Sequence, residues 1–144
     1  MTISSLNGLM AQPGLSAYVA SKFAVRGFTE AIRAEMLLAG HPVQVVVVHP
    51  GGVRANIANA AIPDDPALTG DRRARAEKRL RIYNEKLLTM PPERAAKVIL
   101  DGVARGRTRI VVTAQAVWLV RLVRLSQVGY VSRVVAAEKA IFGG

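Results

Sequence analysis

The sequence contains no cysteine and only two histidines, His41 and His49. The absence of cysteine excludes disulfide bonds, thiolate metal sites and a cysteine nucleophile, and it fits the reducing environment of the cytoplasm. Neither histidine has an acidic cluster at ligand spacing, so no metal site is predicted. His49 ends an apolar run and is interpreted as a structural residue.

A secretory signal and an uninterrupted membrane span are also lacking. The first ten residues, MTISSLNGLM, have neither a basic segment nor a long apolar core. The apolar segment 114–144 contains Arg121 and Arg124, each of which would cost roughly 2.5–3.5 kcal/mol at the centre of a bilayer. We therefore expect a cytoplasmic chain, with membrane association through this segment left open.

Acidic residues are scarce, with 10 Asp and Glu against 20 Lys and Arg and a formal net charge of +10. Such a surplus attracts nucleic acids, anionic lipids or phosphorylated ligands. Aromatic residues make up 5% of the chain and are not interleaved with the basic ones, and no nucleic-acid-binding motif is present. A nucleic-acid partner is therefore not expected.

The chain has enough hydrophobic residues to form the core of one folded domain, since they make up 51% of its 144 residues. Residues 1–4 read as the end of a strand, and residues 15–39 have helical periodicity. The β-branched run VQVVVVH at 43–49 is typical of a strand buried on both faces. Strand, helix and strand at this spacing predict a βαβ unit. The pattern then predicts a long loop, a basic helix over 71–88, a helix that Pro91 and Pro92 open and Gly106 ends, and a strand over 108–113.

A candidate site lies in the segment SAYVASKFA, where Tyr18 stands four residues before Lys22 in the first expected helix. Residues at this spacing lie one above the other on a helix. An ammonium group stabilises a nearby phenolate, so Tyr18 could exchange a proton with a substrate oxygen. Ser5, at the end of the preceding strand, could hydrogen-bond the same oxygen. Taken alone, the pair is equally compatible with an exposed polar contact that has no function.

Together these residues are more specific. Ser5 in SSLNG, Tyr18 thirteen residues later, Lys22 and the segment VQVVVVHPGGVRANI closely resemble the short-chain dehydrogenase/reductase family. The similarity is detailed over residues 2–57 and continues more loosely to the strand at 108–113. It corresponds to the second half of a typical member.

The resemblance implies an α/β fold, the C-terminal half of a Rossmann-type doubly wound parallel sheet without the N-terminal cofactor-binding half. It divides the chain into a partial Rossmann domain over 1–113, in which 56–90 is a substrate loop or lid, and an apolar, basic helical tail over 114–144. It also implies hydride transfer between NAD or NADP and an alcohol or ketone. No residue in the sequence chooses between the two cofactors.

The resemblance also assigns roles by position. Tyr18 resembles the catalytic acid/base, and Lys22 resembles the residue that assists it and bonds the nicotinamide ribose. Ser5 resembles the serine that holds the substrate oxygen, whereas its neighbour Ser4 does not take that role. The turn whose backbone orients the nicotinamide corresponds to Pro50, Gly51, Gly52 and Val53.

Two features depart from the family pattern. Ala55 stands where the family usually has a threonine that contacts the cofactor diphosphate. The strand, glycine-rich turn and helix that hold the pyrophosphate are absent from the sequence as well. We therefore interpret the sequence as truncated, or as one with a misassigned start, and do not expect these residues alone to be active.

Three functional hypotheses follow. The first is an oxidoreductase for a small-molecule alcohol or ketone, lipophilic ones included, that forms a homo-oligomer through the Tyr18 helix as family members commonly do. The second is a non-catalytic remnant that acts as an interaction module through Phe23, Ala31 and Ala34. The third is a peripheral membrane protein that uses the basic helix and the tail.

Overall fold

The computed structural model describes residues 1–54 and 69–142, without the side chains of Arg72, Arg75 and Arg79. Ala55 and the first part of the expected substrate loop lie outside the described residues. The elements in chain order are β1 (Thr2–Ile3), η1 (Leu6–Gly8), α1 (Ser16–Leu38), β2 (Val47–His49), α2 (Gly70–Ile82), the π-helical η3 (Tyr83–Leu87), α3 (Pro92–Ala104), β3 (Arg109–Val111), α4 (Ala114–Leu125) and α5 (Tyr130–Phe142).

The described strands form a parallel sheet of three strands in the order β1-β2-β3. Thr2 pairs with Val47, and Val48 pairs with Ile110. The predicted βαβ unit is therefore present. The paired part of its second strand begins at Val47 instead of residue 43, because both neighbouring strands begin opposite Val47, β1 with Thr2 and β3 with Arg109.

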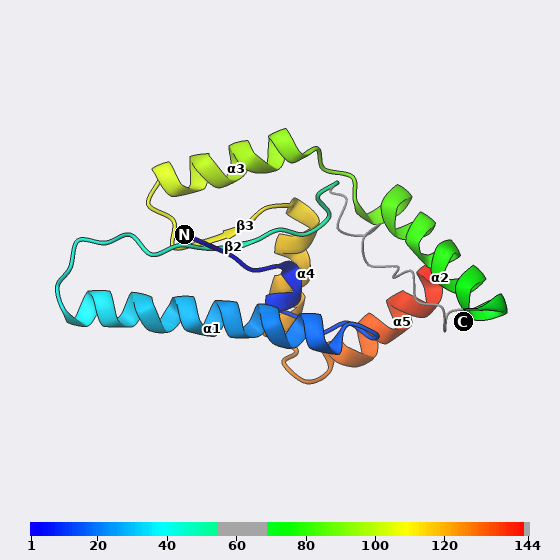
Figure 1. Ribbon diagram of the computed structural model, residues 1–144. Helices are drawn as coiled ribbons and strands as arrows, with labels where there is room; N and C mark the ends of the chain where they lie inside the picture. Colours follow the sequence, from blue (N-terminus) through cyan, green and yellow to red (C-terminus); the bar gives the residue numbers. More distant parts are fainter. Residues whose placement is uncertain (55–68, 143–144) are drawn as a thin grey trace.

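The face of the sheet toward α3 holds the apolar core. Val46 and Val48 pack there with Ile110 and Val112 of the β3 segment and with Ala95 of α3. Figure 1 shows α3 along one side of the sheet and α1 along the other. The valines of the β2 segment that fill this core explain why the sequence before His49 has the pattern of a buried strand.

The opposite face meets α1 through polar contacts. Thr29 is the one buried residue of α1, and its hydroxyl donates to the Val25 carbonyl over 2.6 Å. Since that uses the only hydroxyl proton of Thr29, Thr2 Oγ1 is the donor in the 2.6 Å bond that joins the two threonines. Glu30 of α1 also pairs with Arg109 of β3. Specific hydrogen bonds and an ion pair thus hold α1 against the sheet.

The segment after β3 forms two helices separated by a turn. The Thr113 hydroxyl caps α4 by accepting from the Ala116 backbone N–H over 3.2 Å. The turn at residues 126–129 ends α4, and α5 then runs back to contact α2. Across the described residues, no helix combines the length and the apolar character needed to cross a bilayer.

Candidate active site

The C-terminal ends of β1 and β2 bring Ser5 next to the Pro50–Val53 turn. The Leu6 N–H donates to the Pro50 carbonyl over 2.7 Å, and His49 Nδ1 lies 2.8 Å from the Ser5 carbonyl oxygen. Because a carbonyl only accepts, His49 carries its proton on Nδ1. Two segments far apart in the sequence are therefore tied together at one edge of the sheet.

The two serines after β1 have different surroundings. Ser4 is buried, and its hydroxyl donates to the Lys22 carbonyl over 2.8 Å. Ser5 is half-buried and caps η1, with its Oγ accepting from the Asn7 N–H over 3.2 Å. An accepting hydroxyl keeps its proton for another oxygen, so Ser5 can still donate to a ligand.

Tyr18 and Lys22 lie in the first turns of α1. Lys22 Nζ is 5.5 Å from the centroid of the Tyr18 ring, a cation–π distance. The Tyr18 side chain remains 39% exposed, so a ligand can reach it. The spacing of four residues therefore does bring the ammonium over the phenol ring.

Gly8 lets η1 approach α1. A Cβ at this position would lie 2.8 Å from the Lys22 carbonyl oxygen and would also collide with Ser4 Oγ. The serines of the β1 end and the Tyr18 helix can therefore meet only because residue 8 has no side chain. The sequence alone does not reveal this role of Gly8, since a glycine needed for close packing has the same sequence signal as a turn glycine.

The Pro50–Val53 turn is held on several sides. Gly52 has φ +71°, and a Cβ there would lie 2.8 Å from the Leu87 carbonyl oxygen. The Met90 N–H donates to the Gly52 carbonyl over 2.9 Å. Gly51 faces Leu6 of η1 and Ala116 of α4, where an added Cβ would be 3.1 Å and 3.3 Å from the nearest side-chain atoms of each. The turn is thus fixed between η1, η3 and the start of α4.

These groups could hold a flat, polar ligand such as one end of a dinucleotide. Ser5, Tyr18 and the partly exposed turn lie at the carboxyl edge of a parallel sheet, where open α/β sheets bind ligands. All four residues of the Pro50–Val53 turn are partly exposed, so a ligand can reach the turn from the side that the protein leaves open. Within residues 1–54 and 69–142, no group of three or more acidic or histidine side chains is placed to hold a metal ion.

His49 is fully buried beneath this edge. Burial lowers the pKa of His49 below its ordinary 6.5, although the hydrogen bond to the Ser5 carbonyl acts in the other direction. Its Nε2 is a buried nitrogen without a hydrogen-bond partner in the described part of the chain. The imidazole is therefore neutral, and its hydrogen bond to the Ser5 carbonyl is a structural one that holds Ser5 in place.

Comparison with known proteins agrees with this arrangement. A sequence profile described as short chain dehydrogenase matches residues 1–66. The putative oxidoreductase SadH of Mycobacterium tuberculosis is 48% identical over 143 residues, which is 99% of this chain and 49% of SadH. The chain belongs to the short-chain dehydrogenase/reductase family. The family predicted from Ser5, Tyr18, Lys22 and the Pro50–Gly51 segment is confirmed.

Further family members cover much of the chain. Dehydrogenase/reductase SDR family member 7B of Xenopus tropicalis is 30% identical over 112 residues, which is 78% of this chain and 32% of that protein. A crystal structure of a short-chain dehydrogenase/reductase from Burkholderia phymatum in complex with NAD matches with a TM-score of 0.66 and 25% identity, over 83% of this chain and 44% of that one. The expected partial Rossmann-type α/β fold is therefore confirmed. The chain spans about half the length of SadH.

The buried His49 predicts that the protein loses stability as the pH falls below 6.5. A histidine with a lowered folded-state pKa binds more protons when unfolded, so the free energy of unfolding decreases from the unfolded-state pKa down to the folded-state one. His49→Asn, which can keep a donor toward the Ser5 carbonyl, should remove this part of the pH dependence. Urea unfolding at about pH 7.5 and about pH 5.5 measures the difference.

His41→Asn, in an exposed turn, is the control and should keep the wild-type dependence. Glu30 does not contribute in this range, because its pKa lies below its ordinary 4.5. Burial raises that pKa, but the hydrogen bonds from Arg26 and Arg109 outweigh the burial. An unchanged pH dependence in His49→Asn would show that His49 is not the titrating group.

Proposed function

We propose that this chain carries the acid/base half of an NAD(P)-dependent oxidoreductase that interconverts an alcohol and a ketone. The proposal is carried by the bond from Ser4 Oγ to the Lys22 carbonyl, which holds the strand end with Ser5 against the helix of Tyr18 and Lys22. The same strand end is tied to the Pro50–Val53 turn, in a chain of this family. The names of SadH and its relatives as oxidoreductases, and the NAD in the solved relative, support it.

In the oxidation direction, Ser5 Oγ holds the substrate hydroxyl oxygen, and the Tyr18 phenolate takes the proton from that oxygen. Lys22 stabilises the phenolate through its positive charge, 5.5 Å from the ring centroid. A bound nicotinamide supplies the acceptor for the hydride that leaves the carbon. In the reduction direction, Tyr18 returns the proton to the ketone oxygen.

The binding of the cofactor belongs to the same proposal. Lys22 would also bond the ribose, and the backbone of Pro50, Gly51, Gly52 and Val53 would orient the nicotinamide carboxamide. The rigid packing of the turn supports this role, because an orienting backbone must itself be held in place.

The substrate proposed is a small alcohol or ketone, with a preference for lipophilic ones. Ala116, in the first turn of α4, is buried against Gly51 of the turn. The helix that starts there continues with apolar side chains, so apolar surface borders the proposed site. This neighbourhood favours a substrate with an apolar body over a sugar-like one.

The exposed side of α1 supports a homo-oligomer. Phe23, Ala31 and Ala34 lie at helical spacing and are exposed, and Phe23 borders an apolar cavity of about 390 Å³. The same cavity is lined by Ala11, Gln12, Ser16, Val19 and Ala20. We propose a second copy of the chain as the occupant of this face, in keeping with its small and apolar residues.

The tail supports peripheral membrane contact as a second property. On α4, Trp118, Leu122 and Leu125 lie four and three residues apart and are 65%, 47% and 86% exposed. Arg121 lies beside them, with its guanidinium carbon 5.2 Å from the centroid of the Trp118 ring. An exposed tryptophan with leucines and a flanking cation is the composition of an interfacial helix, so we propose that α4 contacts anionic lipid surfaces.

In an enzyme whose site is completed by the cofactor-binding half, Tyr18→Phe should lower kcat about 10²- to 10⁴-fold, because it removes the group that exchanges the proton. Ser5→Ala should lower kcat as well, whereas the adjacent Ser4→Ala should mainly lower stability. Lys22→Met should weaken cofactor binding and lower kcat, because it removes the positive charge that stabilises the phenolate. Rates with NADH and NADPH over a panel of ketones, together with cofactor fluorescence titration, provide the measurement.

Tyr130→Phe serves as the control, since its hydroxyl only accepts from the Ala11 N–H, over 3.1 Å, outside the proton-transfer group. Full turnover in Tyr18→Phe would contradict the catalytic role and favour the interaction module. A wild-type protein whose site is completed by a cofactor-binding half, but which binds neither cofactor, would contradict the proposal as a whole.

Phe23→Arg should dissociate the proposed oligomer, because a charge would be buried between the two helices. Light scattering coupled to gel filtration gives the mass of the particle for the wild type and the variant. Leu38→Arg is the control, since Leu38 is 91% exposed at the end of the same helix and outside the face. A wild-type protein that stays monomeric at every concentration rules the oligomer out.

Leu125→Asp should abolish flotation with anionic vesicles, and wild-type binding should weaken as the salt concentration rises. Leu100→Asp makes the same change on α3, where Leu100 is 66% exposed, and should leave binding intact. Equal losses in both variants, or no wild-type flotation at low salt, would refute the membrane contact.

A further inference from the structure

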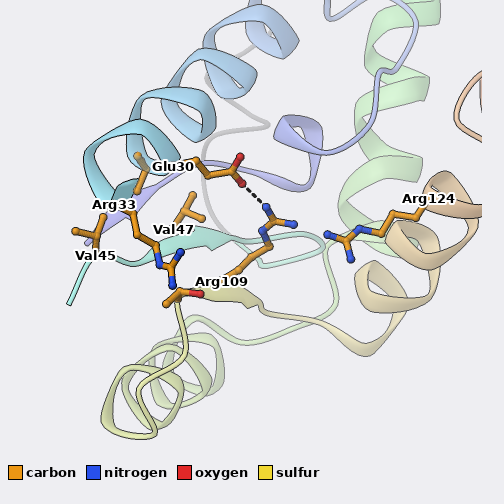
Figure 2. A pocket seen from close by; sticks show the side chains of 8 residues that line it. Glu30, Arg33, Val45, Val47, Arg109 and Arg124 are labelled. Atoms are coloured by element: carbon orange, nitrogen blue, oxygen red, sulfur yellow. Dashed lines mark hydrogen bonds and ion pairs between the residues drawn. The ribbon is translucent and has the colours of Figure 1, made fainter. Parts of the chain in front are cut away.

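A second cavity lies at the other end of the sheet from Ser5 and Tyr18. Its volume is about 590 Å³, and it opens between the later part of α1, the beginnings of β2 and β3, and the end of α4. Figure 2 shows the side chains that line it. They belong to Thr29, Glu30, Arg33, Val45, Val47, Thr108, Arg109 and Arg124. Val45 and Thr108 precede their strands, whereas Ser5 and Pro50 follow theirs, so this cavity is separate from the proposed active site.

Three arginines reach the cavity from three different elements: Arg33 from α1, Arg109 from β3 and Arg124 from α4. In Figure 2, Arg124 extends from α4 toward Arg109, and Arg109 meets the carboxylate of Glu30. The cavity is therefore a point where guanidinium groups converge from separate parts of the chain.

The positive charge of this cluster is only partly neutralised. Glu30 is the one carboxylate among the lining residues, and it is already shared between Arg109 and Arg26, whose Nε lies 3.0 Å from Glu30 Oε1. In the described part of the chain, neither Arg33 nor Arg124 forms an ion pair. Like charges brought together in a partly enclosed space repel one another, so an anion would stabilise the arrangement.

We propose that this cavity binds the phosphate group of a small ligand. The planar fork of a guanidinium matches the oxygens of phosphate, and several arginines can share a group that carries two negative charges. Val45 and Val47 provide an apolar floor for an organic part of the ligand. The volume is within the range of roughly 300–1,000 Å³ found for small-molecule sites, so there is room for a phosphate ester.

Phosphate binding would connect separate elements of the fold, and the added stability can be measured. A phosphate held by Arg33, Arg109 and Arg124 would link α1, β3 and α4 to one another. A ligand that binds only the folded state raises the apparent stability in a saturable way. The bound phosphate would therefore tie the tail helix α4 to the α/β core, independently of the hydride-transfer chemistry.

The test uses inorganic phosphate and phenyl phosphate as probes, with thermal unfolding and phosphorus NMR as readouts. Wild-type protein should show a saturable rise in Tm beyond that of NaCl at matched ionic strength. Arg33→Gln and Arg124→Gln should each weaken phosphate affinity by about tenfold or more, the effect of losing one charge-assisted hydrogen bond. Arg124→Lys, which keeps the charge without the fork, should also weaken it.

Arg121→Gln is the matched control, because it removes the same charge from the same helix at a residue that stacks on Trp118 outside the cavity. Its phosphate affinity should stay within about twofold of the wild type, as expected for a screened distant charge. An equal loss in Arg121→Gln, or a Tm rise that NaCl reproduces, would overturn the proposal. Circular dichroism verifies that each variant is folded.

A parallel arm distinguishes the source of the phosphate group. Vesicles containing phosphatidic acid replace the soluble probes, and flotation is measured for the same variants. Binding of the soluble probes that depends on Arg124 identifies a soluble phosphate ester. Binding only to vesicles, again lost in Arg124→Gln, identifies a lipid headgroup. The control for this arm is Arg105→Gln, which should keep vesicle binding because Arg105 is exposed at the end of α3 and outside the cavity. Binding in neither arm contradicts the site.

Discussion

The close contact between η1 and the first turns of α1 is the constraint on which the candidate active site depends. It requires a glycine at position 8, and the bond from Ser4 Oγ to the Lys22 carbonyl secures it. Through this contact the end of β1 positions the helix that carries Tyr18. On its other side, the same strand end is held to β2 by the His49 imidazole and the Pro50 carbonyl. One short segment that carries Ser5 is therefore in contact with both the Tyr18 helix and the Pro50–Val53 turn, although these three parts are separated in the sequence.

The fold also gives the two ends of the sheet different characters. The carboxyl end has glycines, a serine and a phenol, with the Lys22 ammonium beside the phenol ring. The amino end gathers arginines around a single carboxylate. A parallel sheet produces this separation naturally, because all strands begin at one edge and end at the other. The basic cluster at one edge and the Ser5 and Tyr18 side chains near the other are thus separate places on the described part of the chain.

Much of the architecture is predictable from local patterns. The helical periodicity of α1 and the β-branched run before His49 predict the βαβ unit, and the spacing of Tyr18 and Lys22 predicts their contact. The extent of β2 is not predictable in this way, because it depends on where the neighbouring strands β1 and β3 begin. The convergence of Arg33, Arg109 and Arg124 is likewise invisible in the sequence, since only the folded chain brings them together. The role of Gly8 is a property of the space around it, which no local pattern encodes.

The two faces of the sheet place different demands on sequence variation. Toward α3, Val46, Val48 and Ile110 need only fill space, and swaps among apolar residues of similar volume preserve such packing. Toward α1, the Thr2–Thr29 and Glu30–Arg109 contacts require matching donors and acceptors, so one partner cannot change alone. Helix α1, which carries Tyr18, is thus attached to the face of the sheet where fewer single substitutions are tolerated. Its position is specified by pairs of residues that must vary together, whereas the rest of the core is specified by volume.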